Sequence, residues 1–284
     1  MSKILIIGAS GLVGSRFVEL SKYKDVLVCP GQNVLDITKD NPEIPEADII
    51  INFAAYTNVS EGENQRGDKN GLCWKLNVEG TKNLLEASKN KFFIQVSTDL
   101  VFSGVSGPYS ENDVSEKDSS KVTWYGYTKG QAESLCSGRT ILRLIYPVRA
   151  KYDLKLDYLR KPLSLYDKGK LYPMFTDQQV SIAFIDEVCF ALDKIIEKQA
   201  RGVFHASSSD LTNPFELYAY LLEKVRGVKD VVTPSLLSDF LKTTANPVRY
   251  PMFGGLKVEK TEKILGMKFS TWRGIIDQLV EQGI

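Results

Sequence analysis

The fold is decided by the stretch Lys3-Ile4-Leu5-Ile6-Ile7-Gly8-Ala9-Ser10-Gly11-Leu12-Val13-Gly14. A short apolar run leads into three glycines spaced three apart, and a helical pattern follows. Glycine lets the backbone bend sharply and come close to a ligand. The N-terminus of the next helix then offers N–H groups to a pyrophosphate. The stretch predicts a strand, a nucleotide-binding turn and a helix, with an ordinary tight β–α turn as the alternative.

The composition excludes several classes of function. The chain has 284 residues and a net charge of +1, so we expect neither a nucleic-acid partner nor a membrane surface. No apolar run approaches the roughly 20 residues that span a bilayer, and the first run is too short for a signal peptide, which predicts a cytoplasmic protein. Four scattered cysteines and one histidine, His205, argue against a disulfide framework and a metal site.

Apolar runs alternate with helical patterns over the first half of the chain. Strands are predicted at residues 26–29, 49–53, 92–96 and 141–145, and helices at 12–23, 72–89 and 125–136. Because these strands do not alternate polar and apolar residues, they are typical of a parallel sheet covered on both faces. We therefore predict an α/β fold, a Rossmann-type doubly wound sheet, with residues 1–147 as the dinucleotide-binding domain.

The regular alternation of predicted strands and helices ends at about residue 147. Elements become shorter, with helices predicted at 185–198, 215–225 and 270–282 and a strand at 202–206. We interpret residues 148–284 as a smaller, mainly substrate-binding lobe that is partly interleaved with the sheet. The polar stretch 104–121 is predicted to be a long surface loop.

A tyrosine and a lysine lie four residues apart in Tyr125-Gly126-Tyr127-Thr128-Lys129. On a helix they share a face, and the lysine charge favours the phenolate, so the tyrosine can exchange a proton with an alcohol or carbonyl oxygen. Two other pairs, Tyr166/Lys170 and Tyr220/Lys224, have the same spacing. Only Tyr125 follows a strand that ends in small polar residues.

That strand ends in Ser97, Thr98 and Asp99. Ligands of open α/β sheets bind at the carboxyl ends of strands. Such residues also cap strands and form turns, which is the alternative interpretation. Together with the glycine turn and Tyr125, their position favours a site.

These motifs together resemble the extended short-chain dehydrogenase/reductase superfamily, and within it most closely the dTDP-4-dehydrorhamnose reductases. The matching segments are the glycine turn, Asn52-Phe53-Ala54-Ala55-Tyr56-Thr57, the helix Asn77–Leu84, Ser97-Thr98-Asp99-Leu100-Val101-Phe102-Ser103-Gly104 and Tyr125–Lys129. The resemblance covers residues 3–147 firmly. It implies reduction of the 4-keto group of a nucleotide-linked 6-deoxy sugar, as in dTDP-rhamnose biosynthesis.

The resemblance also implies roles for individual residues. The catalytic residues would be Thr98, Tyr125 and Lys129, with Tyr125 as the proton donor. The cofactor would contact Gly8, Ser10, Gly11, Leu12, Val13 and Gly14 at the pyrophosphate, Asp36 and Ile37 near the adenine, Ala54, Ala55 and Tyr56 along the adenosine, and Val96, Tyr125 and Lys129 near the nicotinamide ribose. The substrate sugar nucleotide would contact Thr98, Asp99, Tyr146 and Arg249, although Arg249 also fits an ordinary surface arginine.

The sequence gives partial information on whether the cofactor is NAD or NADP. An NAD site usually has a carboxylate about 20 residues past the glycines, and residues 28–32 carry none. The sequence therefore favours NADP over NAD, with Arg16 as a candidate partner for the 2′-phosphate and a solvated helix position as its alternative.

Three departures from the family pattern bear on the substrate. Leu100 stands where the family has Tyr, Tyr146 stands where it often has Trp, and residues 177–183 keep only Asp177-Gln178 of its D-Q-x-G-x-P-T motif. Alternatives therefore stay open: a nucleotide-sugar epimerase or dehydratase of the same superfamily, or a non-catalytic NADP-binding regulatory subunit. By analogy with the superfamily, the helices at 72–89 and 125–136 would form a homodimer face.

Overall fold

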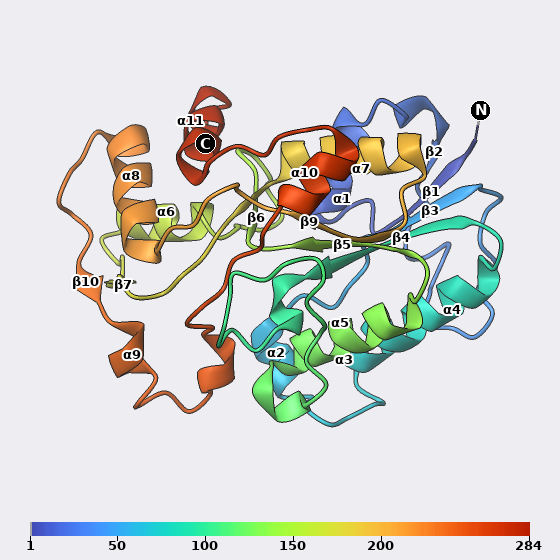
Figure 1. Cartoon of the computed structure of the whole chain (residues 1–284), viewed down its shortest axis with the longest axis horizontal. Helices are drawn as coiled ribbons and strands as arrows, with labels where there is room; N and C mark the ends of the chain where they lie inside the picture. Colours follow the sequence, from blue (N-terminus) through green and yellow to red (C-terminus); the bar gives the residue numbers. More distant parts are fainter. Residues whose placement is uncertain (1) are drawn as a thin grey trace. The chain divides into compact units, whose positions relative to one another are not determined.

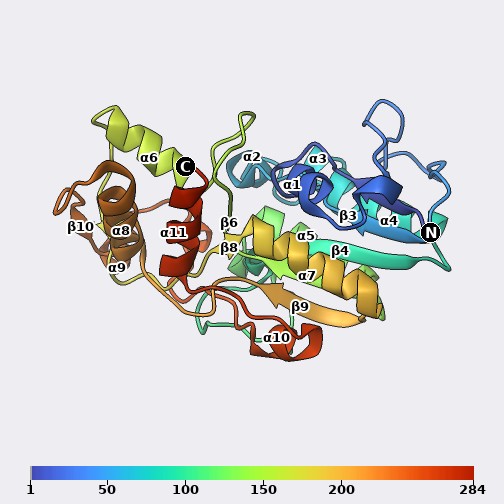
Figure 2. The same ribbon diagram turned by 90° about the horizontal axis from the view of Figure 1, so that it is seen from above.

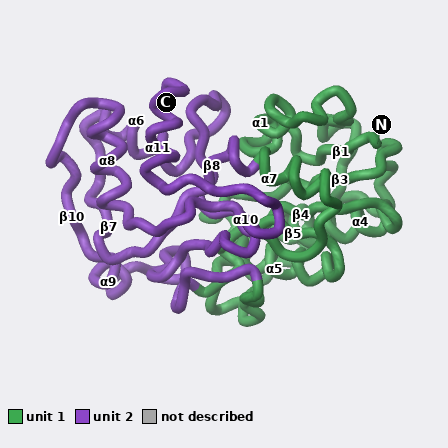
Figure 3. Tube along the Cα trace, turned by 45° about the horizontal axis from the view of Figure 1, so that its top comes forward, with its two compact units in different colours: residues 1–103, 112–143, 189–204 green, residues 104–111, 144–188, 205–284 purple. Residues whose placement is uncertain are grey.

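The computed structural model describes residues 2–284, and the chain folds into two compact units (Figures 1 and 3). Unit 1 holds the chain up to Ser103 together with Asn112–Arg143 and Cys189–Phe204. Unit 2 holds Gly104–Glu111, Leu144–Val188 and His205–Ile284. The boundaries of these units differ from the predicted single boundary at residue 147, because most of a helix and of a strand from the second half of the chain belongs to unit 1.

A six-stranded sheet forms the centre of unit 1, in the order β2-β1-β3-β4-β5-β9. The pairs β1–β2, β1–β3 and β3–β4 are parallel. The strands are β1 (Ile4–Ile7), β2 (Leu27–Val28), β3 (Ile49–Asn52), β4 (Phe92–Thr98), β5 (Thr140–Leu144) and β9 (Gly202–Ala206). Because β1 has β2 on one side and β3 on the other, the strand order reverses at β1, which is where open α/β sheets bind ligands.

Helices cover both faces of this sheet (Figures 1 and 2). One face carries α1 (Leu12–Leu20) and α7 (Ile185–Lys198), and the other carries α3 (Leu72–Trp74), α4 (Gly80–Ala87) and α5 (Trp124–Leu135). The short helix α2 (Val59–Glu63) packs against α5. The predicted Rossmann-type α/β fold is confirmed.

The predicted elements are found with shifted ends. The strand predicted at 26–29 is only Leu27–Val28, because Lys24–Val26 forms a 3₁₀ turn. The helix predicted at 12–23 ends at Leu20, and the helix at 72–89 contains a π-helical segment, Lys75–Glu79, between α3 and α4. Strand β4 runs on to Thr98, so Ser97 and Thr98 belong to the strand itself. The predictions at 185–198 and 202–206 are confirmed at those bounds.

The core of unit 1 explains why the strands are continuously apolar. Leu5, Ile50 and Phe93 come from three neighbouring strands, and each is fully buried with Leu84 of α4 in one cluster. Burying each such side chain contributes about 1.5–3 kcal/mol relative to exposing it. Because these three strands are parallel, the polar residues that follow them meet at one edge of the sheet.

Unit 2 has a core of its own. Helix α8 (Pro214–Arg226) packs against α11 (Trp272–Glu281), and Leu217, Leu221 and Trp272 are buried there. Two short parallel pairs complete it, β6 (Pro147–Val148) with β8 (Ala183–Phe184) and β7 (Met174–Phe175) with β10 (Pro234–Ser235). The remaining helices are α6 (Arg160–Asp167), α9 (Leu237–Phe240) and α10 (Glu259–Leu265). The helices predicted at 215–225 and 270–282 correspond to α8 and α11.

None of the helices in residues 2–284 is both long and apolar enough to cross a membrane.

Candidate active site

The glycine turn after β1 packs directly on the segment after β3. Gly8 has φ +83°, and a Cβ there would lie 2.8 Å from the backbone nitrogen of Ala54. A Cβ on Gly14 would lie 2.3 Å from the carbonyl oxygen of Gly8. Gly11 closes the turn by donating its N–H to the same carbonyl at 3.1 Å, and it caps α1 without a side chain. The backbone is therefore uncovered where a pyrophosphate would approach the helix.

Side-chain amides hold the segment that follows β3. Asn52 donates to Oε1 of Gln95 at 3.0 Å and accepts the N–H of Ala54 at 3.1 Å. Asn77 accepts the N–H of Tyr56 at 2.8 Å and donates to the hydroxyl of Thr128 on α5 at 2.9 Å. This network fixes the predicted adenosine-lining residues and ties them to α5.

Of the two predicted adenine-side residues, Asp36 lines a cavity of about 440 Å³ formed by residues between Gln32 and Glu43, whereas Ile37 is buried in the core of unit 1. Asp36 accepts the N–H and hydroxyl of Thr38, and these hydrogen bonds lower the pKa of its carboxyl. Asn83 donates to the carbonyl oxygens of Ile37 and Lys39 and so holds this loop. Arg16 pairs with Glu19 at 3.0 Å on α1.

Thr98, Tyr125 and Lys129 come together between β4 and α5. Thr98 ends the strand, and its hydroxyl hydrogen-bonds the Tyr125 phenol and donates to Oδ1 of Asp99 at 3.1 Å. Lys129 lies one turn beyond Tyr125 on α5, and its Nζ donates to the carbonyl oxygen of Val96 at 2.7 Å. All of these side chains are at least nine-tenths buried.

A glycine allows this close approach. A Cβ on Gly126 would lie 2.0 Å from the carbonyl oxygen of Leu100, so no other residue fits between α5 and the turn Asp99–Val101. Thr123 caps the helix by accepting the N–H of Gly126 at 3.0 Å. The glycine of the Y-G-x-T-K motif therefore places Tyr125 against the end of β4.

Burial shifts the ionisation of all three titratable groups in the cluster. It raises the pKa of Tyr125 well above its usual value, and the neighbouring Asp99 raises it further, while the hydrogen bond from Thr98 opposes both effects. Burial lowers the pKa of Lys129 to about 8, against the attraction of Glu133. It also raises the pKa of Asp99 to about 7. Before any ligand binds, Tyr125 thus carries its proton at neutral pH, as a proton donor requires.

The chain was compared with known proteins. The family model for the RmlD substrate binding domain matches residues 2–283. The chain belongs to this family. The resemblance to dTDP-4-dehydrorhamnose reductases, a family of NAD(P)-dependent oxidoreductases, is thereby confirmed.

Three curated relatives cover most of this RmlD-family chain. A probable low-salt glycan biosynthesis reductase of Haloferax volcanii is 26% identical, over 86% of this chain and 87% of its own. A dTDP-4-dehydrorhamnose reductase of Mycolicibacterium smegmatis is 25% identical, over 82% and 72%. Methionine adenosyltransferase 2 subunit beta of Danio rerio is 29% identical, over 76% and 71%.

A solved structure has the same fold. It is a dTDP-4-dehydrorhamnose reductase of Bacillus anthracis in complex with NADP, with a TM-score of 0.82 and 20% identity over 99% of both chains.

The predicted substrate residues Tyr146 and Arg249 lie in unit 2 of the RmlD-family chain. Tyr146 has φ +39°, an unusual conformation for a bulky side chain, and stacks on Tyr158 with ring centroids 3.9 Å apart. Arg249 lies in a loop that Gln178 holds by donating to the carbonyl oxygen of Pro251 at 2.9 Å. Their contact with substrate stays a prediction.

In the sequence, Ser97 stands out only as part of the polar strand end and Asn77 only as part of a matching helix, with no individual role for either. The Ser97 hydroxyl is buried beside Thr98 and has no hydrogen-bond partner within residues 2–284, so it can serve a ligand at the strand end. Asn77 begins the matching helix Asn77–Leu84, but only the fold shows that its side-chain amide joins Tyr56 to Thr128. His205 is fully buried in β9, and its Nδ1 lies 3.0 Å from the Lys257 carbonyl oxygen.

We expect Gly126→Ala to lose most activity. The added methyl group must displace the Leu100 carbonyl, and so moves Tyr125 away from Thr98. A shift of about 1 Å at reacting groups can cost about 100-fold in rate. The measurement is turnover beside thermal unfolding, with Gly31→Ala as the control because a Cβ there meets nothing within 4 Å. Wild-type turnover in Gly126→Ala would contradict the packing argument.

We expect Asp99→Asn to change the pH dependence of stability. The pKa of Asp99 is about 7 in the fold and about 3.9 when unfolded, so the folded state holds the extra proton between these values. Its contribution is therefore full below pH 4 and is lost as the pH rises through 7, at up to about 1.4 kcal/mol per pH unit. Urea unfolding between pH 5 and 7.5 should show stability falling more steeply in the wild type than in Asp99→Asn. Equal slopes would disprove the shift.

Proposed function

We propose that this chain is an NAD(P)H-dependent reductase of the 4-keto group of a nucleotide-linked 6-deoxy sugar. The observation that carries the proposal is the buried cluster of Thr98, Tyr125 and Lys129 at the carboxyl end of β4. Membership of the RmlD family and the two reductases among the relatives support the same substrate class.

The residues of unit 1 fit a dinucleotide. The cradle of Gly8 and Gly14 is one that a Cβ would fill, and Gly11 leaves the start of α1 without a side-chain cap. We propose that the pyrophosphate is held by residues 8–14 and the adenosine by Ala54–Tyr56. No carboxylate lies in residues 28–32, so the proposal favours NADP over NAD.

The bound nicotinamide would supply a hydride to the ketone carbon. As negative charge develops on the ketone oxygen, Tyr125 donates its phenolic proton to that oxygen. The Thr98 hydroxyl donates a hydrogen bond to the same oxygen and orients it. Lys129 would hold the nicotinamide ribose, and its charge would stabilise the phenolate that Tyr125 becomes. Asp99, Tyr146 and Arg249 are proposed to contact the sugar nucleotide.

A second candidate is a regulatory subunit that binds NADP without turning over substrate. The 29% identity to methionine adenosyltransferase 2 subunit beta favours it. The complete Thr98, Tyr125 and Lys129 set favours the reductase, because binding alone needs no protonated phenol in the site. An epimerase or dehydratase would use the same cluster but consume no reduced cofactor.

We expect the wild type to consume NADPH when given dTDP-4-keto-6-deoxyhexose, as followed by loss of NADPH absorbance. Tyr125→Phe removes only the proton donor, so it should keep NADPH affinity and lose about 100-fold or more of kcat. Tyr127→Phe is the matched control, since its ring stacks on Trp124 instead. Full activity in Tyr125→Phe would refute the mechanism. NADPH binding without turnover in the wild type would favour the regulatory subunit.

We expect Gly11→Leu to weaken NADPH binding. A side chain at the start of α1 would extend into the space proposed for the pyrophosphate. Fluorescence titration with NADPH measures the affinity, and thermal unfolding checks that the variant folds. Unchanged affinity in a folded variant would count against this site.

A further inference from the structure

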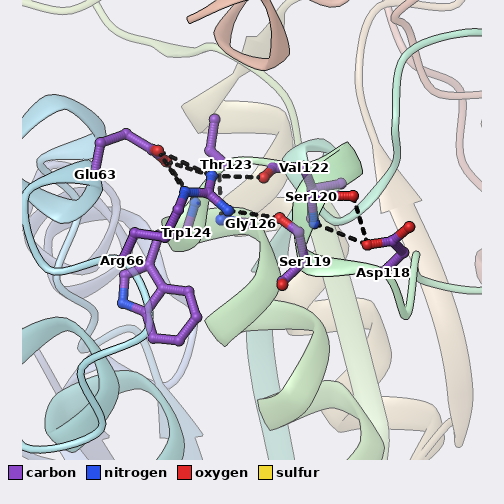
Figure 4. A network of polar contacts seen from close by, with 9 residues as sticks. All are labelled: Glu63, Arg66, Asp118, Ser119, Ser120, Val122, Thr123, Trp124 and Gly126. Atoms are coloured by element: carbon purple, nitrogen blue, oxygen red, sulfur yellow. Dashed lines mark hydrogen bonds and ion pairs between the residues drawn. The ribbon is translucent and has the colours of Figure 1, made fainter.

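We propose that the ion pair between Glu63 and Arg66 positions Tyr125 by fixing the first turn of α5 (Figure 4). The two residues lie at and just beyond the end of α2 and contact no reacting group in the proposed mechanism, so they act as positioning residues. The catalytic consequence rests on the proposed function. The structural consequence does not.

Glu63 binds the beginning of α5. Its Oε1 accepts the N–H of Trp124 at 2.5 Å, across 61 positions of sequence. Trp124 is the first residue of the helix, and its N–H has no partner within the helix ladder. A carboxylate at this end also interacts favourably with the helix dipole. Glu63 therefore supplies a contact that the helix cannot make for itself.

Arg66 ties the same carboxylate to the chain that leads into α5. Its Nε and Nη2 donate to the two oxygens of Glu63 at 3.0 and 3.1 Å, the bidentate arrangement that fixes orientation. Its Nη1 donates to the carbonyl oxygen of Ser119 at 2.6 Å, and Nη2 donates to that of Val122 at 2.9 Å. One guanidinium thus joins the end of α2, the turn Ser119–Lys121 and the residue before the Thr123 cap (Figure 4).

We call the hydrogen bonds of Glu63 and Arg66 to Ser119, Val122 and Trp124 the clamp, and it lies next to Tyr125. Trp124 is the residue before Tyr125. Gly62 of α2 also packs close to this tyrosine, because a Cβ added to Gly62 would lie 3.9 Å from the Cβ of Tyr125. On its other side the same turn of α5 is confined by the Leu100 carbonyl oxygen, through Gly126. The first turn is therefore held from two sides, and release of the Glu63 side would let the phenol move relative to Thr98.

The clamp is distinguishable from an ordinary stabilising pair. The Arg66 side chain is 34% exposed and that of Glu63 is 12% exposed, and ion pairs with a solvent-exposed partner contribute little to global stability. Its removal should therefore loosen one turn without unfolding the protein. A similar ion pair exists in unit 2, where the Nε and Nη2 of Arg226 donate to the two carboxylate oxygens of Asp167 at 2.8 and 2.7 Å. Asp167→Ala removes that pair and serves as the control for Glu63→Ala.

Hydrogen exchange followed by mass spectrometry tests the structural step on the whole protein. In Glu63→Ala, the amides of residues 123–126 should exchange at least about 10-fold faster, because they lose the contact that orders the turn. Glu63→Gln keeps an oxygen for Trp124 and should show a smaller increase. Peptides from β4 should be unchanged in Glu63→Ala, and the amides of residues 123–126 should be unchanged in Asp167→Ala. Unaltered exchange at 123–126 in a folded Glu63→Ala would overturn the proposal.

Kinetics test whether this order matters for proton donation. Glu63→Ala should lower kcat at least about 10-fold while NADPH affinity and KM stay within about twofold. In a Tyr125→Phe background the same change should cost less than about twofold more, because groups that act as a unit are not additive. A fully additive loss would show that Glu63 does not act through Tyr125. If the wild type turns over no sugar nucleotide, the proposed reductase function fails, and the exchange result alone decides the clamp.

Discussion

The approach of α5 to the carboxyl end of β4 is the contact on which the rest of the site depends. Gly126 permits it, since any Cβ would collide with the Leu100 carbonyl oxygen. This approach brings Tyr125 to Thr98 and aligns Lys129 with the Val96 carbonyl oxygen. Steric exclusion at one backbone position thereby sets the geometry of three side chains on two elements.

That close packing also determines the electrostatics of the cluster. Excluding water disfavours the charged forms, so the phenol and the Asp99 carboxyl hold their protons more tightly and the Lys129 ammonium holds its proton less tightly. Glu133 opposes the effect on Lys129 and is itself paired with Arg143, whose Nη2 lies 2.8 Å from its Oε2. A protonated phenol beside an ammonium is the state from which a ketone oxygen can be protonated.

Hydrogen bonds between segments far apart in the chain maintain this arrangement. The Asn77 amide links Tyr56 to Thr128, and Glu63 with Arg66 links α2 to the start of α5. The first connection joins the segment after β3, proposed to line the adenosine, to the helix proposed to carry the proton donor, and the second joins α2 to the start of that helix. These hydrogen bonds anchor α5 to two other segments of unit 1.

The sequence by itself determined the Rossmann-type fold, the glycine turn and the order of strands and helices. These follow from local signals: apolar runs, helical periodicity and glycines at fixed spacing. Helix and strand ends were less well determined, as at Leu20, because fraying and short turns depend on neighbouring elements. Resemblance to a family suggested the roles proposed for Thr98, Tyr125 and Lys129, which periodicity could not.

Only the tertiary structure shows which contacts are made by residues that share a local pattern. Tyr220 and Lys224 share the spacing of Tyr125 and Lys129, yet both contact Asp277 on α11 and so join two helices of unit 2. The carboxylate of Glu63 and the N–H of Trp124 are likewise 61 positions apart, and no local pattern links them. Contacts of that range are set by how the sheet orders its strands, which is a property of the folded chain as a whole.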